Sequence, residues 1–269
     1  MGLDLADRNG RYAGKVAEAA GMAAWPTGTA EVWWARRQDA ASGHIAFLDE
    51  TERQRWADYR RDADRERFLA GCALAKMVIA DRAGQRPGDV SFDRTCRRCG
   101  RAHGKPAIKG GRLEFSIAHS GDLVAVAVAT APVGVDVEQL EGRARPPGGG
   151  DADALARLVL AGDERAALAA VPPPGRARAF LVAWARKEAV TKATGDGLRA
   201  AFRDVVVAAD HGRPRLVAWP YPQDPRGVSL HDLDAPEPGY VAALAFLGRC
   251  EEVRTRDGSA LLTGLPPNP

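Results

Sequence analysis

The chain has 269 residues, of which 45% are hydrophobic and 27% charged, with a formal net charge of +3. This length and apolar content suffice for one large core or two modest ones, which excludes a globally disordered chain. The small basic excess is not that of a dedicated nucleic-acid binder. No apolar run approaches the roughly 18 residues of a membrane span. We expect a soluble cytoplasmic protein with no nucleic-acid or membrane partner.

The first 28 residues are small and polar with little periodicity, and we expect an N-terminal extension. Asp4 and Asp7 interrupt any continuous apolar segment, so the pattern is not that of a signal peptide. After the extension, Asp49 and Glu52 have the spacing of a capping box at the start of a helix. In chain order we predict a strand at 31–37, helices at 48–59 and 65–84, strands at 123–130 and 133–140, a loop at 143–151, and helices at 152–169 and 176–193.

An internal repeat divides the chain. A shift of 112 positions places Leu48-Glu52-Arg53 on Leu160-Glu164-Arg165 and Phe68-Leu69 on Phe180-Leu181. Slightly further on, "GDLVAVAVA" at 121–129 resembles "GYVAALAFL" at 239–247. Matches in the same order predict two similar α+β halves that meet near residue 132. The expected organisation is an extension (1–28), an N-terminal half (29–132), a C-terminal half (133–250) and a C-terminal tail (251–269).

Two acidic residues share one face of the predicted strand "VGVDVE". Side chains alternate along a strand, so Asp136 and Glu138 point the same way while the valines between them point the other. Two carboxylates on an otherwise apolar strand repel each other unless a cation lies between them. A solvated strand end with two acids of no function is the alternative interpretation.

The stretch "WARKEAVTKATGDGL" contains two of the six lysines in a chain that has 32 arginines. On a helix Glu188 and Lys192 are one turn apart and share a face, while Lys187 lies about 100° away. The plain alternative is a surface Glu–Lys pair worth about 0.3 kcal/mol. If Glu188 faces the two strand acids, three carboxylates converge, and oxygen ligands of this kind suit Mg²⁺ shared with substrate phosphates.

Other motifs carry weaker signals. "FSIAHSGD" contains His119 and Ser120, which are not a hydrolase pair because the G-x-S-x-G elbow is missing and neighbours on a strand point apart. Lys105 in "HGKP" is a candidate phosphate contact, although the segment is not a P-loop. Cys96 and Cys99 have zinc-like spacing, but a structural site needs four ligands, so a half-site or a reduced surface pair is the expectation.

Four motifs in order resemble those of the Sfp-type 4′-phosphopantetheinyl transferases. "WARKEAVTKATGDGL" is similar to the W-x-x-K-E-(A/S)-x-x-K-x-x-G-x-G-L signature of that family, and "VGVDVE" to its G-(I/V)-D-x-E motif. "HGKP" resembles the family's G-K-P turn and "FSIAHS" its F-N-x-S-H-S strand. The resemblance covers about residues 48–200 and implies two pseudo-symmetric α/β halves in a monomer.

The resemblance also implies an activity. Members of the family transfer 4′-phosphopantetheine from coenzyme A to a serine hydroxyl of an apo acyl or peptidyl carrier protein, and release 3′,5′-ADP. Carried over by position, Asp136, Glu138 and Glu188 would hold Mg²⁺. Glu188 and Lys192 would be the catalytic residues, with Glu188 as ligand and candidate base and Lys192 at the leaving phosphate. The residues implied to bind the nucleotide phosphates are Arg67, Lys105, His119, Ser120 and Lys192, with Arg53 or Arg55 as helpers.

Two positions depart from the family pattern: Ser116 stands where Asn is usual, and Ala118 where the first Ser is usual. Ala118 lacks a hydroxyl that the pattern would direct at a phosphate. The acidic carrier protein would be recognised through the segment after Glu138, with apolar residues 155, 158 and 159 as docking candidates or as ordinary core. Two alternatives stay open: a Mg²⁺-dependent phosphohydrolase that uses the same acids, and a non-catalytic module that only binds coenzyme A.

Overall fold

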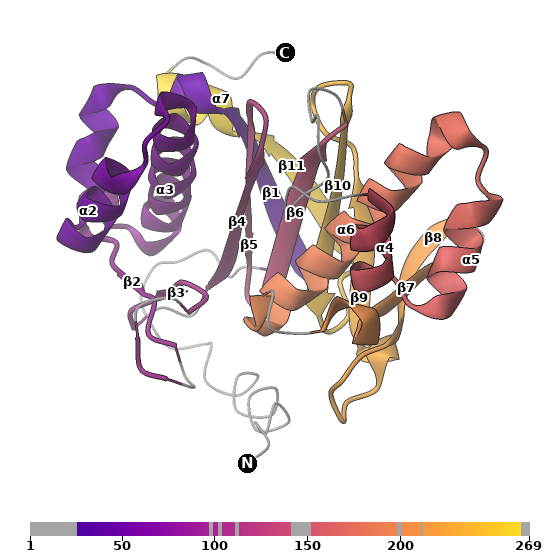
Figure 1. Cartoon of the computed structure of the whole chain (residues 1–269). Helices are drawn as coiled ribbons and strands as arrows, with labels where there is room; N and C mark the ends of the chain where they lie inside the picture. The colour runs from indigo at the N-terminus through magenta and orange to yellow at the C-terminus, as the bar shows by residue number, and fades with distance from the viewer. Residues whose placement is uncertain are drawn as a thin grey trace.

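The computed structural model describes residues 26–96, 99–101, 104–110, 113–140, 152–197, 201–210 and 212–264. The predicted N-terminal extension up to residue 25 and the predicted loop 143–151 lie outside the described residues. The described chain forms two sheets side by side, each with a long helix packed on it (Figure 1). None of the described helices has the length and apolar character needed to cross a membrane.

The N-terminal half is built on a four-stranded sheet in the order β11-β1-β5-β4, in which β11 (Glu252–Asp257) comes from the C-terminal end of the chain. Strand β5 is buried along its whole length and pairs antiparallel with both neighbours, while β11 joins β1 in parallel. Helix α3 packs on this sheet and ends at Gly84, which caps it in the left-handed conformation. The elements are β1 (Thr29–Arg36), α2 (Glu50–Asp58), α3 (Asp62–Ala83), β4 (Glu114–Ser120) and β5 (Leu123–Ala129).

The C-terminal half repeats this plan on a three-stranded sheet in the order β6-β10-β9. Its middle strand, β10, pairs antiparallel with both neighbours, as β5 does in the other half. Helix α6 packs on β6 and β10, and α4 and α5 lie at the outer side of α6 (Figure 1). The elements are β6 (Val133–Gln139), α4 (Ala152–Val159), α5 (Gly162–Ala170), α6 (Pro173–Thr194), β7 (Val206–Asp210), β8 (Arg213–Ala218), β9 (Val228–Leu233) and β10 (Tyr240–Leu247).

Several short elements complete the described chain. A two-stranded ribbon of β2 and β3 precedes β4, and β7 and β8 form a second ribbon. The others are 3₁₀ helices of three to six residues in the connections. Their bounds are η1 (Arg37–Asp39), η2 (Ser42–Phe47), η3 (Pro87–Asp89), β2 (Phe92–Asp93), β3 (Ala107–Ile108), η5 (Phe202–Asp204) and η6 (Pro225–Gly227).

Three segments differ from the sequence-based expectation. The single helix expected at 152–169 is two helices, because the chain turns at Leu160 and Ala161, and Ala161 is the N-cap residue of α5. The prolines of "VPPPGR" begin α6 rather than only ending the preceding helix, because proline is tolerated in a first helical turn. Residues 252–263 of the expected tail form β11 (Glu252–Asp257), which completes the edge of the N-terminal sheet, and α7 (Gly258–Thr263), which contacts β1 and α3.

The predicted repeat is visible in the polar interior of the two halves. Glu52 and Glu164, which the shift of 112 superposes, each accept a hydrogen bond from the backbone N–H of the residue that caps the start of a helix, Asp49 in the first half and Ala161 in the second. Each also forms an ion pair with a lysine that has no exposed side-chain surface, Lys76 in the first half and Lys187 in the second. Lys187, one of the two lysines in "WARKEAVTKATGDGL", is therefore buried in an ion pair at the core.

The two halves meet along β4 and β6. Ser116 Oγ accepts a hydrogen bond of 3.1 Å from Val135 N, and Ser120 Oγ accepts one of 3.1 Å from Gln139 N. Both bonds join residues 19 positions apart, so the two strands run in the same direction. Serine hydroxyls thus supply acceptors for the backbone of β6 along the boundary between the halves.

Candidate active site

Strand β6 carries the two acids to the boundary between the halves. Asp136 and Glu138 are 5% and 7% exposed, and the valines at 133, 135 and 137 fill the core on the opposite face, as the alternation predicts. Gly134 allows α6 to come close, because a Cβ at this position would lie 2.0 Å from Ala189 O. The absence of a side chain at one position of β6 thus brings the acids next to the helix.

Helix α6 supplies the other two charged residues of the site, Lys192 and Glu188. Lys192 donates from Nζ to Asp136 Oδ1 at 2.6 Å and to Val135 O at 3.2 Å, so helix and strand are joined at the site. Glu188 lies one turn earlier on α6, and its carboxylate is half-buried. Gly195 ends the helix in the left-handed conformation, one turn after Lys192.

The charges of these groups are coupled. Burial and the negative charge of Asp136 raise the pKa of Glu188 to about 7, although Lys192 opposes the shift. Burial works against the ammonium of Lys192, but the carboxylates of Asp136 and Glu188 raise its pKa overall. Asp136 and Glu188 are therefore close enough to repel each other, and Lys192 offsets the negative charge of both.

The raised pKa of Glu188 predicts a pH dependence of stability. The folded-state pKa of about 7 lies above the ordinary value of 4.5, so the native state binds this proton more tightly than the unfolded state does. The free energy of unfolding should therefore fall as the pH rises from 4.5 through 7. Urea unfolding of metal-free protein at pH 5 and pH 8 measures the difference, which should shrink in Glu188→Gln. An unchanged difference in that variant would contradict the assignment.

The three acids suit a hard divalent cation by their donor chemistry. All donors are carboxylate oxygens, as Mg²⁺ prefers, and the mutual effect of Asp136 and Glu188 places two of them within electrostatic reach. As they are arranged, no three of the described Asp, Glu, His and Cys side chains stand close enough together to hold a metal ion. Asp136 is paired with Lys192, and Glu138 Oε2 accepts a 3.0 Å hydrogen bond from Ser120 Oγ. A metal-loaded site would need these carboxylates to turn toward one another.

A pocket of about 460 Å³ opens beside the acids. Its lining combines residues of the N-terminal half with the end of α6, and Lys192 belongs to both the pocket and the acidic cluster. Five cationic side chains and a single acidic one, Asp196, line it. A pocket with this charge suits an anionic ligand with several phosphates. The cations are Arg55, Arg67, Arg94, Lys105 and Lys192.

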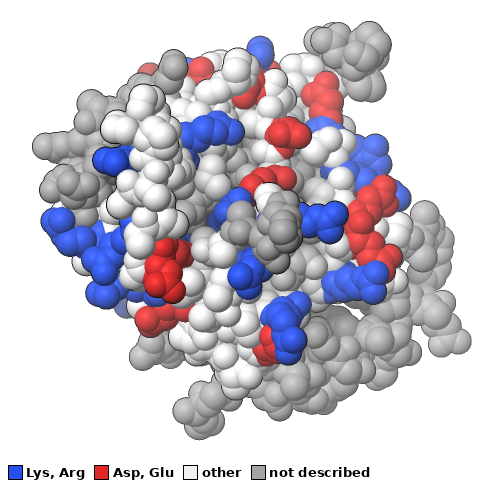
Figure 2. All heavy atoms as spheres, turned by 90° about the vertical axis from the view of Figure 1, so that its right-hand side faces the viewer, with Lys and Arg blue, Asp and Glu red and all other residues white. Residues whose placement is uncertain are grey.

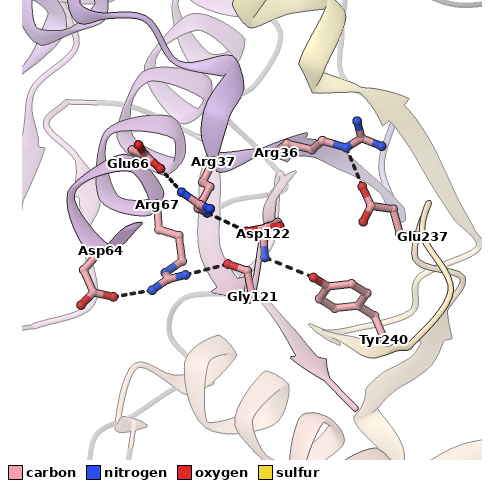
Figure 3. A network of polar contacts seen from close by, with 9 residues as sticks. All are labelled: Arg36, Arg37, Asp64, Glu66, Arg67, Gly121, Asp122, Glu237 and Tyr240. Carbon is pink, nitrogen blue, oxygen red and sulfur yellow. Dashed lines mark hydrogen bonds and ion pairs between the residues drawn. The ribbon is translucent and has the colours of Figure 1, made fainter. Parts of the chain in front are cut away.

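Arg67 is held in place by a network at the start of α3 (Figure 3). Its guanidinium donates to Gly121 O at 2.7 Å and forms an ion pair of 2.5 Å with Asp64. The next residue of the β4–β5 turn, Asp122, pairs with Arg37 at 2.6 Å and donates from its backbone to Tyr240 Oη at 3.1 Å (Figure 3). The turn therefore links an arginine of the pocket to a strand of the C-terminal half.

The other predicted phosphate ligands have different surroundings. His119 lines the pocket from β4, where burial lowers the pKa of its ring to about 4 and the nearby cations Lys192 and Arg67 add to the shift. Lys105 lines the pocket, while its Nζ donates to Val133 O at 3.0 Å and to Ala193 O at 3.3 Å. Ser120 is buried and bonded to Glu138, so its hydroxyl is directed at an acid.

The structure distinguishes between Arg53 and Arg55, the two arginines that the sequence offered as helpers in binding the nucleotide phosphates. Arg55 lines the pocket and lies 6.0 Å from the ring centre of Phe68, whereas Arg53 is not among the lining residues and lies 3.8 Å from Glu50. Residues two apart on a helix point about 200° apart. Only one of the pair can face the pocket, and α2 turns Arg55 toward it.

Sequence reasoning missed three residues of the pocket region. Arg94, just after β2, lines the pocket and has a buried Nε. Asp196 of the "GDG" turn accepts a hydrogen bond from the hydroxyl of Tyr221, which comes from the β8–β9 connection. The only sequence signal for Arg94 was its place near "HGKP", and nothing local connects Tyr221 with a residue 25 positions earlier.

Three further sequence predictions concern single residues. The Ala118 side chain is 3% exposed and lies in the core cluster with Val135, so this position does not face a phosphate. Cys96 is buried and Cys99 exposed, and neither forms a disulfide. His103, which follows the two cysteines in the sequence and could have served as a third zinc ligand, lies outside the described residues.

Comparison with known proteins identifies the family. Residues 132–245 match the family model of the 4′-phosphopantetheinyl transferase superfamily, and residues 32–131 match that of the N-terminal part of a 4′-phosphopantetheinyl transferase. The two matches adjoin each other between residues 131 and 132. Both halves of the described fold are therefore represented in the family models.

Curated relatives of this chain are also 4′-phosphopantetheinyl transferases. The 4′-phosphopantetheinyl transferase HetI of Nostoc sp. is 33% identical over 194 residues, which cover 68% of this chain and 72% of the relative. A 4′-phosphopantetheinyl transferase of Bacillus subtilis is 28% identical over 57% of this chain and 63% of its own length. The transferase Sfp of the same species is 23% identical over 77% of this chain and 85% of the relative. The chain belongs to the 4′-phosphopantetheinyl transferase superfamily.

Proposed function

We propose that this 4′-phosphopantetheinyl transferase moves the phosphopantetheine group of coenzyme A to a serine of an apo acyl or peptidyl carrier protein at the boundary between its halves. The observation that carries the proposal is Lys192, which lines the cationic pocket and pairs with Asp136 at 2.6 Å. One side chain thus connects a site for an anionic nucleotide with a site for a cation. The products are the holo carrier protein and 3′,5′-ADP.

The side chains that line the pocket contribute in different ways to binding the nucleotide phosphates. Arg55, Arg67 and Arg94 offer guanidinium groups, which suit phosphate oxygens because their donors form a planar fork. A neutral His119 donates one N–H to a phosphate oxygen without adding charge. Lys105 contributes mainly its stem, because its ammonium already donates to two carbonyl oxygens.

The acids are the proposed metal ligands. Asp136, Glu138 and Glu188 would hold Mg²⁺, which when bound offsets the charge of the diphosphate and helps to orient it. Ser120 keeps Glu138 in place from the opposite half. Glu188 is also the candidate base for the proton of the attacking serine. A bound cation would lower the pKa of about 7 that burial gives its carboxyl, so the ligand role of Glu188 ranks above its role as a base.

In-line attack by the serine hydroxyl on the β-phosphorus forms the new ester bond and breaks the bond to the α-phosphate oxygen of the leaving 3′,5′-ADP. Such transfers depend mainly on positioning and on neutralising charge. Lys192 lies where it can offset charge that grows on the leaving group, since it is already shared between pocket and acids. The arginines hold the leaving nucleotide in line.

The outer face of the C-terminal half suits an acidic carrier protein. Leu158 on α4 is 69% exposed, while Val159 is in the core, so the docking candidates of the sequence divide between surface and interior. Figure 2 shows basic side chains spread over this face with acidic ones between them. We infer that Leu158 contacts an apolar patch of the carrier protein, and that the basic side chains around it contact acidic residues of the carrier. We also propose that the enzyme acts as a monomer in the cytoplasm. The exposed arginines in the described part of this half are Arg157, Arg165, Arg176, Arg178, Arg203, Arg213, Arg215, Arg226 and Arg249.

Mass spectrometry of an apo carrier protein tests the proposal. Incubation with this protein, Mg²⁺ and coenzyme A should add one phosphopantetheine group to the carrier, and EDTA should prevent the gain. Release of 3′,5′-ADP without a carrier would favour a phosphohydrolase. Binding of coenzyme A without transfer to any of several carriers would favour a non-catalytic module.

Replacing the arginines of α2 one at a time checks the assignment of the pocket. Arg55→Ala should raise the KM for coenzyme A roughly tenfold, the equivalent of about 1.4 kcal/mol, because one charged contact to phosphate is lost. Arg53→Ala, two residues away, should leave the KM within about twofold, because surface ion pairs contribute little. Steady-state kinetics with coenzyme A as the varied substrate decide. The reverse order of effects would assign the phosphate contact to Arg53.

A further inference from the structure

Lys187 uses all its hydrogen-bonding capacity inside the C-terminal half. Its Nζ donates to Glu164 Oε2 at 2.6 Å, to Val205 O at 2.6 Å and to Phe202 O at 2.9 Å. An ammonium has three N–H donors, so none is left for a substrate. Although it is adjacent to Glu188 in sequence, Lys187 does not contact the proposed reacting groups, and its role has to be sought in what it holds together.

The partners of Lys187 fix α6 to the segment that follows it. Glu164 bonds Ala161 N at 2.7 Å through one oxygen and Val207 N at 2.8 Å through the other, so α5 and β7 are joined to the same ion pair. The carbonyl of Phe202 lies beyond the turn that carries the pocket residues Gly195 to Gly197. The ion pair thus anchors the chain on both sides of that turn.

The equivalent pair of the N-terminal half offers an internal comparison. Lys76 Nζ lies 2.7 Å from Glu52 Oε2 and donates to Phe47 O at 2.8 Å. This pair joins α3 to α2, the helix that carries Arg55 to the pocket. Both pairs join a glutamate to a lysine that has no exposed side-chain surface, but one holds the nucleotide side of the site and the other holds the helix with Glu188 and Lys192.

We propose that Lys187 and Glu164 are positioning residues for the transfer step, and that Lys76 and Glu52 position the nucleotide-binding side alone. The inference rests on the proposed function. Misplacing reacting groups by about 1 Å can cost about 100-fold in rate. Release of α6 from Glu164 therefore slows the chemical step, whereas release of α2 from Lys76 weakens the binding of coenzyme A.

The experiment compares Lys187→Met with Lys76→Met, each of which removes the ammonium and keeps most of the stem. Urea unfolding first establishes a temperature at which both variants are folded, and both unfolding midpoints should fall. At that temperature Lys187→Met should lower kcat about 100-fold with little change in the KM for coenzyme A. Lys76→Met should raise that KM with kcat within about twofold. Equal losses of kcat in both variants would show that the pairs only stabilise the fold and would overturn the inference.

A gentler pair of variants, Glu164→Gln and Glu52→Gln, decides the question if either methionine variant does not fold. Binding of Mn²⁺ in the presence of coenzyme A, followed by electron paramagnetic resonance, provides a readout that needs no turnover. Affinity for Mn²⁺ should fall in Glu164→Gln and stay unchanged in Glu52→Gln, and equal affinities would again overturn the inference. If the wild-type protein itself transfers nothing to any carrier, the proposed function fails. If the wild type is active and the pairs behave alike, only this inference fails.

Discussion

Glu188→Gln should reduce phosphopantetheine transfer about 1,000-fold, because it removes a negative oxygen from the proposed cation site. The amide keeps the size of the side chain, so the packing of α6 against β6 and β10 should be retained. Glu188 is not among the residues that line the cationic pocket. Binding of coenzyme A measured by calorimetry should therefore change far less than transfer measured by mass spectrometry of the carrier.

The matched control is Asp163→Asn in α5, where an exposed acid is neutralised by the same chemical change. This variant should transfer at the wild-type rate. Transfer by Glu188→Gln within tenfold of the wild type would remove Glu188 from the catalytic residues. Equal losses of transfer and coenzyme A binding would instead place Glu188 on the nucleotide side of the site.

Gly134→Ala should cost about 3 kcal/mol of folding stability or more, because the added methyl group has no space. Its Cβ would lie 2.0 Å from Ala189 O and 2.5 Å from Ala193 N, and both atoms belong to the backbone of α6. Relief requires the helix to move away from β6, and this movement would also separate Lys192 from Asp136. We therefore expect loss of transfer in whatever fraction still folds.

Gly162→Ala is the corresponding control, since a Cβ at this first residue of α5 meets nothing within 4 Å. The control should be at least as stable as the wild type, because alanine favours the helical conformation over glycine. Urea unfolding of the two variants measures the contrast. A Gly134→Ala protein with wild-type stability and transfer would show that α6 can move off β6 without consequence for the site.

The sequence predicted the parts of the fold that depend on local pattern. The capping box at Asp49 and Glu52 is present, and the strands at 123–130 and 133–140 lie within one or two residues of their predicted ends. The acids of β6 and Glu188 with Lys192 were found because strand and helix periodicity place them on defined faces. The repeat indicated two halves, and the strand orders of the two sheets agree with it.

Contacts across the boundary between the halves could not be found in the same way. Ser120 was predicted to bind phosphate, but its hydroxyl bonds Glu138, and that depends on the alignment of β4 with β6. The two lysines of "WARKEAVTKATGDGL" lie in the same motif, and the sequence alone does not tell which of them is buried. Lys187 is buried beside Glu164, and Lys192 reaches the pocket. Helical geometry places them on different faces, and only the packing of α6 decides which face is the core.

The order of the strands along the chain limits how the enzyme can be divided into two fragments. A cut between residues 140 and 152 would leave β6, with Asp136 and Glu138, on the first fragment, although β6 belongs to the C-terminal sheet. The second fragment would keep α6 and also β11, which pairs with β1 of the N-terminal sheet. Each fragment would thus lack a strand of its own sheet and carry one that belongs to the other. Neither would contain a whole set of acids, so an enzyme split at this position has to work by complementation.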